Sequence, residues 1–330
     1  MRTICRESAL QPKLGVETGP AAIRETGIFK ALAQLGRDVR DYGDVRPDLI
    51  DPDPPLHGMR NWRNIHSYNL KASHRYGIDN VDITLADRVK QVIEDGKLCV
   101  TLGGDHSIAL GTVYGHVLAS KKSVGVIWVD AHADINTPLS SLSGNVHGMS
   151  LSFLCEELED YHPPIPSWEW PDPCLTADRI VFIGLRDVDP LERLAIDKTG
   201  VKAYSMHEVE QLGIREVARR AIEDINPNGD RAIHVSFDID AIDPVVAPCT
   251  GTPVPGGLSL REGEYLMEVI HETGALEALD MVEVNPLLGS GEEAEKTAQA
   301  AELLILAACG RYRGGNVPLG VTDLPLSRNS

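Results

Sequence analysis

The 330-residue chain lacks the features that mark several classes of protein. No run approaches the roughly 18 consecutive apolar residues of a membrane-spanning helix, so we expect no membrane segment. The six cysteines stand far apart without a Cys-x-x-Cys pair, and residues 1–13 lack the apolar core of a secretory signal. We therefore expect reduced thiols and a cytoplasmic protein, with an organelle as the alternative.

Basic residues are also scarce, because 31 Lys and Arg stand against 49 Asp and Glu and the formal net charge is −18. A nucleic-acid partner needs a basic surface, so none is expected. The acidic field would attract a small cationic substrate. The same excess of acids could equally serve only to keep the protein soluble.

Apolar runs alternate with longer amphipathic stretches along the whole chain. This order predicts an α/β fold with a parallel sheet covered by helices on both faces. The expected strands are 98–103, 124–129, 179–185, 201–205, 232–237 and 278–284. The expected helices are 20–35, 83–95, 108–120, 151–158, 207–225, 260–273 and 292–308. No linker or repeat divides the chain, which favours a single domain over 1–330.

Three segments fall outside this alternation. Residues 51–80 are polar and read as a long excursion, and residues 159–178 contain five prolines and are expected to be a loop. Residues 311–330 form a tail without periodicity. Loops of this length in a compact domain are usually functional or mobile.

Acids and histidines follow the ends of five expected strands. These clusters are 103–107, 130–134, 186–189, 238–243 and 283–286. In parallel sheets, ligands bind outside the carboxyl ends of the strands. A buried strand that ends in several carboxylates needs partners for them, because an unpaired buried charge is too costly. We therefore expect cations where these ends meet.

The two most acidic clusters, Asp130-Ala131-His132-Ala133-Asp134 and Asp238-Ile239-Asp240, predict a metal site. Alternate residues of an extended strand point to one side, so the two sets should converge. With His106 from the cluster at 103–107, the candidate metal ligands are His106, Asp130, His132, Asp134, Asp238 and Asp240. Four carboxylates balance two divalent ions, and oxygen-rich sites with some imidazole suit Mn²⁺ better than Zn²⁺. Two such ions about 3.5–4 Å apart can share a hydroxide that acts as nucleophile.

Each part of this set has a simpler explanation when taken alone. The pair Asp238 and Asp240 could cap a helix, and His106 could be an ordinary hydrogen-bond donor after a Gly-Gly turn. The conjunction of such residues at several strand ends favours the metal site.

Six motifs together resemble the arginases of the ureohydrolase family, most closely those of animals and other eukaryotes. They are Gly-Gly-Asp-His-Ser (103–107), Asp-Ala-His-Ala-Asp-Ile-Asn-Thr-Pro (130–138), Ser-Gly-Asn-Val-His-Gly (143–148), Ile-Gly-Leu-Arg-Asp-Val-Asp (183–189), Ser-Phe-Asp-Ile-Asp (236–240) and Gly-Thr-Pro-Val-Pro-Gly-Gly-Leu (251–258). The likeness runs from about Gly15 to Asn316. It implies a three-layer α/β/α fold with a mostly parallel sheet of about eight strands. It also implies two Mn²⁺ per subunit and hydrolysis of L-arginine to L-ornithine and urea by a hydroxide that bridges the ions.

The same resemblance implies a role for each site residue. It makes the six candidates above the metal ligands, and it makes His147 a catalytic proton shuttle. Asp134 would pass a proton to the departing amine, and Glu283 would hold the guanidinium, which a carboxylate can bind through two hydrogen bonds. The contacts to the amino-acid end of the substrate would come from Asn136, Ser143, Asn145, Asp187 and Asp189.

Two segments raise further expectations. Arg6, Glu7 and Ser8 interrupt the run where the family has its first strand, so that strand should be missing, short or misplaced. The tail 311–316 resembles the segment that packs between subunits in trimeric animal arginases, with Arg313 at the position of an interface arginine. A homotrimer is therefore expected, with a disordered end as the alternative.

Two other functions remain open at this point. An agmatinase or a related guanidino amino-acid hydrolase would share the metal site, but agmatine has no α-carboxylate for Asn136, Ser143 and Asn145 to recognise. A catalytically silent regulatory homologue would be expected to lack part of the ligand set, which is complete here.

Overall fold

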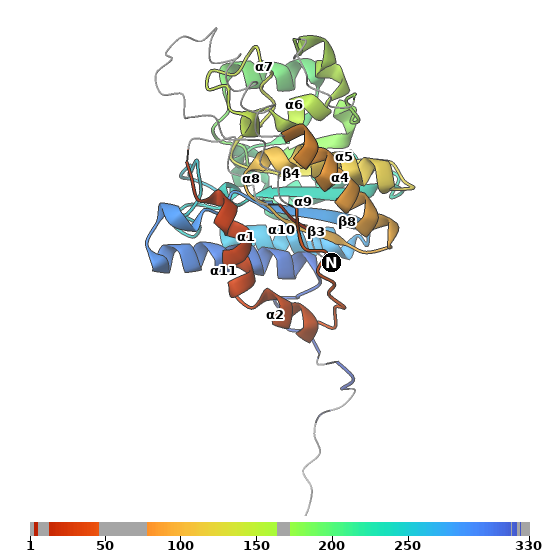
Figure 1. The fold of residues 1–330 in the computed structure, drawn as a ribbon, viewed down its shortest axis with the longest axis vertical. Helices are drawn as coiled ribbons and strands as arrows, with labels where there is room; N and C mark the ends of the chain where they lie inside the picture. Colours follow the sequence, from red (N-terminus) through yellow and green to blue (C-terminus); the bar gives the residue numbers. More distant parts are fainter. Residues whose placement is uncertain are drawn as a thin grey trace, which may run out of the picture.

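The computed structural model describes residues 3–5, 13–45, 78–163, 172–317, 319–321 and 324. Its centre is an eight-stranded sheet in the order β2-β1-β3-β8-β7-β4-β5-β6, and every described pairing is parallel. The strands are β1 Thr3–Cys5, β2 Asp44–Val45, β3 Cys99–Leu102, β4 Val124–Val129, β5 Ile180–Ile183, β6 Lys202–Tyr204, β7 Ala232–Asp238 and β8 Leu276–Val282. Helices cover both faces, which confirms the expected three-layer fold (Figure 1).

One face of the sheet is packed almost wholly with apolar side chains. The helices on this face are α1 Gly19–Glu25, α2 Ile28–Gln34, α9 Ile214–Ile225, α10 Leu260–Glu272 and α11 Gly291–Ala308. From β7 the side chains of Ile233, Val235 and Phe237 enter this core, and all three are fully buried. Figure 1 shows α11 beneath the sheet, with α1 crossing it.

The opposite face carries α4 Ile78–Glu94, α5 Ala109–Ala119, α6 Ser150–Leu154 and α7 Pro190–Thr199. Here the apolar contacts are interrupted by polar side chains of β7, which alternate with the apolar ones along the strand. His234, Ser236 and Asp238 are buried and lie on this face. Because successive side chains of a strand point to opposite faces, the sequence Ile-His-Val-Ser-Phe-Asp sends apolar and polar groups to different layers.

The expected strands and helices are confirmed apart from their ends and the second half of helix 151–158, because α6 ends at Leu154 and a 3₁₀ helix follows from Glu156. The expected helix 20–35 is divided into α1 and α2 at Gly27, and helix 207–225 is divided into α8 Met206–Leu212 and α9 at Gly213. Both glycines have positive φ, 93° and 76°, which other residues rarely adopt. Sequence reasoning missed the two-residue β2 and the whole of α7.

The first strand is present but short, and it lies between β2 and β3 rather than at the sheet edge. The segment 159–178 is not wholly a loop, because 3₁₀ helices span Glu156–Tyr161 and Ala177–Arg179. The excursion at 51–80 ends inside α4, and its residues 51–77 lie outside the described part, as do residues 6–12. Across the ranges that are described, no helix is long and apolar enough to cross a membrane.

Candidate metal centre

The five strands that end in polar clusters are consecutive neighbours in the sheet, in the order β3-β8-β7-β4-β5. Because all are parallel, their carboxyl ends lie along the same edge. His106 follows β3, Glu283 follows β8, Asp130 follows β4, and Asp238 is the last residue of β7. The predicted convergence of these clusters is therefore confirmed.

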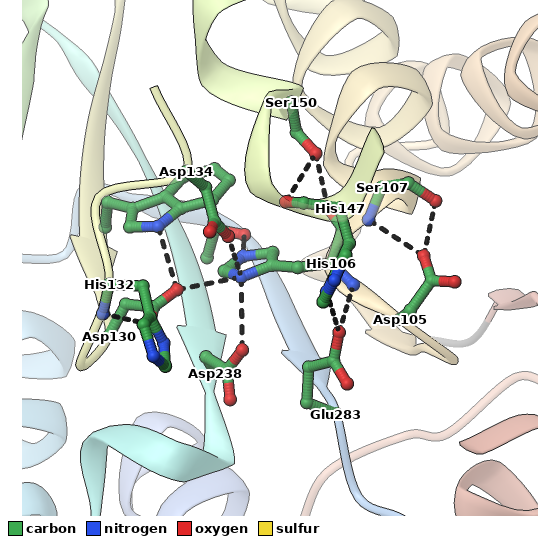
Figure 2. A network of polar contacts seen from close by, with 12 residues as sticks. Asp105, His106, Ser107, Asp130, His132, Asp134, His147, Ser150, Asp238 and Glu283 are labelled. Carbon is green, nitrogen blue, oxygen red and sulfur yellow. Dashed lines mark hydrogen bonds and ion pairs between the residues drawn. The ribbon is translucent and has the colours of Figure 1, made fainter. Parts of the chain in front are cut away.

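The imidazole of His106 lies at the centre of a group of carboxylates (Figure 2). Its Nδ1 is 3.0 Å from Asp130 Oδ2, 3.2 Å from Asp134 Oδ2 and 3.4 Å from Asp238 Oδ2. His106 is fully buried, and none of the three acids is more than 10% exposed at its side chain. Of these residues, His106, Asp130 and Asp134 form a group that could hold a metal ion, and Asp238 lies beside it.

Asp130 also belongs to a second group of possible ligands. Its other oxygen, Oδ1, is 3.4 Å from His132 Nδ1, which in turn lies 3.1 Å from Asp240 Oδ2. The groups His106–Asp130–Asp134 and Asp130–His132–Asp240 each bring their ligand atoms within 4.8 Å of one another. One carboxylate is therefore shared between two adjoining groups.

These side chains converge through tight turns and not, as expected, through strand alternation. β4 ends at Val129, and Asp134 has a φ of 48°, in the left-handed region that is uncommon for residues other than glycine. Glu283 has a similar φ of 62°. Strained backbone such as that of Asp134 and Glu283 persists only where the surroundings enforce it.

Asp238 also caps the 3₁₀ helix Ile239–Ala241, because its side chain accepts from Asp240 N at 2.8 Å. The capping role and the place of Asp238 in the cluster therefore coexist.

The crowding of acids and imidazoles shifts their pKa values strongly. Burial opposes the protonated form of His132, but hydrogen bonds to Asp130 and Asp240 raise its pKa to about 12. Burial and the charge of Asp130 raise the pKa of Asp134 to about 6. Burial and the charge of Asp240 likewise raise the pKa of Asp238 well above its ordinary value. Without cations the cluster therefore retains protons, and a cation that binds there should displace them.

A test of whether a metal fits is the hydrogen bonding of His106. Its Nε2 lies 2.9 Å from Ser236 Oγ, whose hydroxyl donates to Asp280 Oδ2 at 3.3 Å, so the Ser236 oxygen accepts from Nε2–H. Nδ1 meets no hydrogen-bond partner in suitable geometry among the described residues. A buried lone pair that faces three carboxylate oxygens needs a cation or a proton between them, so the donor set fits a divalent metal ion.

His147 and Glu283 form a pair beside this cluster. The His147 Nδ1 lies 3.2 Å from Glu283 Oε1, which also accepts from the backbone N–H of His106 at 3.0 Å (Figure 2). Burial disfavours the charged imidazole, but the hydrogen bond to Glu283 raises the pKa of His147 to about 9. The pair is therefore an imidazolium beside a carboxylate in the absence of a metal.

The residues expected at the amino-acid end of a substrate fall into three groups. Asn136 Nδ2 donates to Asp189 Oδ2 at 3.1 Å, so these two side chains adjoin. Ser143 Oγ accepts from the backbone N–H of Asn145 at 3.2 Å. Asp187 stands at 3.9 Å from His132 Nε2, and its side chain is 70% exposed. Asn136 and Asp189 are linked to the cluster because Asn136 lies two residues after Asp134. Asp187 is linked to it by its distance to His132.

Glu192, which sequence reasoning missed, links these two loops. Its carboxylate accepts from the backbone N–H of Asp189 at 3.0 Å and of Ile135 at 3.2 Å. The first contact belongs to a capping box at the start of α7. Burial, with the charge of Asp134, raises the pKa of Glu192 to about 7. The pattern Asp189-Pro190-x-Glu192 is a helix-start signal that could have revealed both α7 and this link.

Trp128 and Arg186 also support the cluster and were missed. The Trp128 ring stacks on His106 at 3.9 Å between centroids, and its Nε1 donates to Asp130 Oδ2 at 3.0 Å. Its place near the end of β4, two residues before Asp130, is the signal that could have found it. Arg186 donates to the carbonyls of Asp240 and Val254, both at 2.6 Å, and so ties two loops beneath the cluster.

The fold and the paired ligand groups together define a metal-dependent hydrolase of the α/β/α type. The sequence matches the Arginase family over residues 4–310, and the chain belongs to this family. It is 46% identical to the mouse protein "Arginase-2, mitochondrial" over 306 residues, which are 92% of this chain and 83% of that protein. It is 45% identical to the human protein of the same description, covering 96% of this chain and 86% of that one.

Solved structures agree with this membership. The native arginase of Bacillus caldovelox superposes with a TM-score of 0.81 at 35% identity, covering 94% of this chain and 98% of that one. The Entamoeba histolytica arginase in complex with L-ornithine gives a TM-score of 0.75 at 31% identity, covering 94% and 97%.

Proposed function

We propose that this protein hydrolyses L-arginine to L-ornithine and urea with two Mn²⁺ ions bound at the carboxyl edge of the sheet. The observation that carries the proposal is the pair of ligand groups that share Asp130, with His147 and Glu283 beside them. The family membership and the relatives described as arginases support the same reaction.

The metal ligands in this proposal are His106, Asp130, His132, Asp134, Asp238 and Asp240. Four carboxylates match the charge of two divalent ions, and oxygen donors with two imidazoles suit Mn²⁺. When bound, such ions activate a water molecule as a nucleophile at neutral pH. Asp134 then transfers a proton to the departing amine, and His147 exchanges protons with solvent.

The remaining residues bind and orient the substrate. Glu283 holds the planar guanidinium, whose fixed charge a carboxylate matches. Asp189 binds the α-ammonium, Asp187 supports it, and Asn136 donates to the α-carboxylate. Ser143 and Asn145 lie in the same loop region and donate to that carboxylate as well.

The alternative substrate agmatine lacks the α-carboxylate, so the polar loop would have nothing to recognise in it. A decarboxylated substrate would also leave the side-chain donor of Asn145 without this partner, and an unpaired buried donor costs about 1–3 kcal/mol. A silent regulatory homologue is disfavoured because no member of the proposed ligand set is replaced by a residue unable to bind metal.

The test is to strip the protein of metal, add Mn²⁺ and measure urea release from L-arginine and from agmatine. We expect turnover of L-arginine and little or none of agmatine. The variant Asp189→Asn should raise KM for L-arginine more than it lowers kcat, with the exposed acid variant Asp197→Asn as a matched control from α7. Preference for agmatine would overturn the substrate assignment, and no turnover of either would favour the regulatory alternative.

We also propose that residues 1–330 form one domain, that the protein is a homotrimer and that it works in the cytoplasm. A single sheet holds strands from Thr3 to Val282, which supports the first point. Arg313 pairs with Glu268 of its own α10 at 2.8 Å, which holds the tail segment 311–317 at a fixed place from which it could contact another subunit. Native mass spectrometry tests the trimer, and cell fractionation tests the compartment against the mitochondrion of the mouse and human relatives.

A further inference from the structure

A stripe of buried polar side chains crosses the sheet face under α5, starting at the metal cluster and ending at the opposite edge. Such groups are rarely buried without partners, so their contacts define a network. Thr112 and His116 come from α5, Ser120 follows it directly, and β7 and β8 contribute His234, Ser236, Glu277 and Asp280. None of the histidines in this stripe belongs to the proposed ligand set.

Asp280 is the point at which the two halves of the stripe meet. Its Oδ2 accepts from Thr112 Oγ1 at 2.6 Å, from Ser236 Oγ at 3.3 Å and from His234 Nε2 at 2.8 Å. Its side chain is 1% exposed. Three donors around one oxygen identify Asp280 as a buried carboxylate anion, so His234 carries its proton on Nε2.

The second half of the stripe is a direct contact between two imidazoles. His234 Nδ1 and His116 Nδ1 are 3.2 Å apart, and His116 Nε2 lies 3.3 Å from Glu277 Oε2. Both histidines are fully buried, while the Glu277 side chain is 32% exposed and also accepts from Ser120 at 3.2 Å. Within the described part of the chain, the stripe is partly exposed at Glu277 and the neighbouring Ser120.

Counting protons shows that this pair must respond to pH. His234 Nε2 donates to Asp280, so its Nδ1 has a lone pair that accepts from His116 Nδ1–H. A neutral His116 then turns the lone pair of its Nε2 toward the carboxylate of Glu277, which is a repulsive contact. One added proton on that nitrogen makes every contact in the stripe a donor–acceptor pair. The site for this proton lies at the exposed end.

We propose that the His116–His234 pair is a buried proton-binding site that adjusts how strongly His106 holds a metal ion. The inference rests on the metal site of the proposed function. A charged pair offsets the negative charge of Asp280, which then accepts less strongly from Ser236. The Ser236 oxygen in turn polarises His106 Nε2–H less, and His106 Nδ1 becomes a weaker electron donor to a metal. Proton uptake at one edge of the sheet thus weakens metal binding at the other.

The surroundings determine the direction of the pH response. Among the described residues, the charged groups that act on the pair are Asp280 and Glu277 on β8, and Lys122 after α5 acts in turn on Glu277. β4 presents the apolar sequence Val-Gly-Val-Ile-Trp-Val, and α4 approaches α5 through Ala86 at Gly115. Burial lowers the pKa of His116, although Glu277 opposes this. The pair is therefore neutral at pH 7 and charged in acid.

The test compares Mn²⁺ affinity with pH for the parent and two variants. Glu277→Gln removes the charge that favours the added proton, and its amide can donate to the neutral His116. His116→Asn keeps a donor to His234 but cannot be protonated. Mutation of a residue that hydrogen-bonds to a metal ligand typically changes metal affinity about 10–100-fold. The His116–His234 pair is one contact further away, so we expect a smaller effect: both variants should bind Mn²⁺ about threefold more tightly than the parent at pH 6. At pH 8 the three proteins should agree.

The control is His162→Asn, a partly buried histidine that contacts Ser152 outside the stripe and should leave the affinity unchanged. Ring ¹⁵N spectra of the metal-free protein should show His116 taking up a proton as the pH falls. The proposal is overturned if the parent binds Mn²⁺ and both variants follow its pH dependence, or if His116 takes up no proton. A parent that binds no Mn²⁺ would overturn both this proposal and the proposed metal site. If the parent binds Mn²⁺ and both variants share its pH dependence, only this proposal fails.

Discussion

The two faces of the sheet differ in what they bury, and β7 is the strand that separates them. Toward α9, α10 and α11 it sends Ile233, Val235 and Phe237 into an apolar core. Toward α5 it sends His234, Ser236 and Asp238, which join a polar network that ends at the candidate metal centre. Because side chains alternate along β7, its apolar residues pack in the core on one face and its polar residues join the candidate metal centre on the other.

The polar face depends on hydrogen-bond partners, whereas the apolar face depends on close packing. A buried polar group without a partner costs about 1–3 kcal/mol. Among the described residues of the polar face, nearly every buried side-chain polar atom has a partner, and the orphaned atoms include His106 Nδ1 and Asp280 Oδ1. Substitutions on the two faces should therefore fail in different ways.

The largest effect is expected from Asp130→Asn on the polar face. The shared carboxylate serves both ligand groups, so its loss should remove metal binding and lower urea release by at least about a thousandfold, corresponding to roughly 4 kcal/mol. Urea release and bound metal per chain are the measurements. The exposed Asp197→Asn on α7 should change neither. Retained metal with full activity in Asp130→Asn would remove the proposed role of this residue.

A pair of neighbours on β7 tests the comparison directly. Phe237→Ala should lower the free energy of unfolding by about 3–5 kcal/mol, because it leaves a cavity in the apolar core, and should not change Mn²⁺ affinity in the fraction that is folded. Ser236→Ala should instead weaken Mn²⁺ binding about tenfold, because it removes the acceptor of His106 Nε2–H. Urea denaturation and metal titration measure the two effects. The comparison would be wrong if both variants lost stability and affinity in the same proportion.

The next effect concerns the pH dependence of the metal-free protein. Burial lowers the pKa of His147, but the hydrogen bond to Glu283 and the charges of Glu283, Asp105 and Asp134 together raise it to about 9. The raised pKa contributes about 3 kcal/mol to the free energy of unfolding. This contribution is complete below the pKa of the unfolded chain, near 6.5, and is lost as the pH rises through about 9.

Unfolding by urea at pH 6.5 and pH 9.5 measures this loss. His147→Asn should lose less stability than the parent over this range, and the exposed His207→Asn should lose as much as the parent. An equal loss in the parent and His147→Asn would show that the pair with Glu283 does not stabilise the fold.

The smallest effect is expected at Asp187, which lies 3.9 Å from His132 and is 70% exposed. Solvent screens so exposed a pair, so Asp187→Asn should change Mn²⁺ affinity by less than about threefold. Asp240→Asn, whose buried oxygen lies 3.1 Å from the same imidazole, should abolish binding at that group. Metal titration of the two variants side by side distinguishes them, and similar losses would show that burial does not control the contribution of an acid here.

Much of the fold could be predicted because its signals are local. The apolar runs of β4 and β7 and the acids that follow them indicated strands and a site at their ends, and neighbouring strands place those ends together. Helix α7 was missed because Asp189 was interpreted only as a substrate contact, although with Glu192 it also forms a capping box. The two-residue β2 is too short to carry a periodic pattern.

The polar stripe could not be predicted for a different reason. His116 and His234 are 118 residues apart in the chain, and each stands alone in an apolar run. Only the pairing of β7 with β8 and the packing of α5 bring them together. The sharing of Asp130 between two ligand groups could not be predicted either. Asp134 joins Asp130 through a turn with positive φ and not through strand alternation.

The most direct test of the account is a titration of the metal-stripped protein with Mn²⁺, followed by calorimetry in buffers of different ionisation enthalpy. Because imidazoles and carboxylates of the polar face hold protons in the absence of metal, binding should release protons. We expect two ions per chain, with proton release that is lost together with binding in Asp130→Asn. Binding of no Mn²⁺, or of ions that Asp130→Asn retains without change, would contradict it.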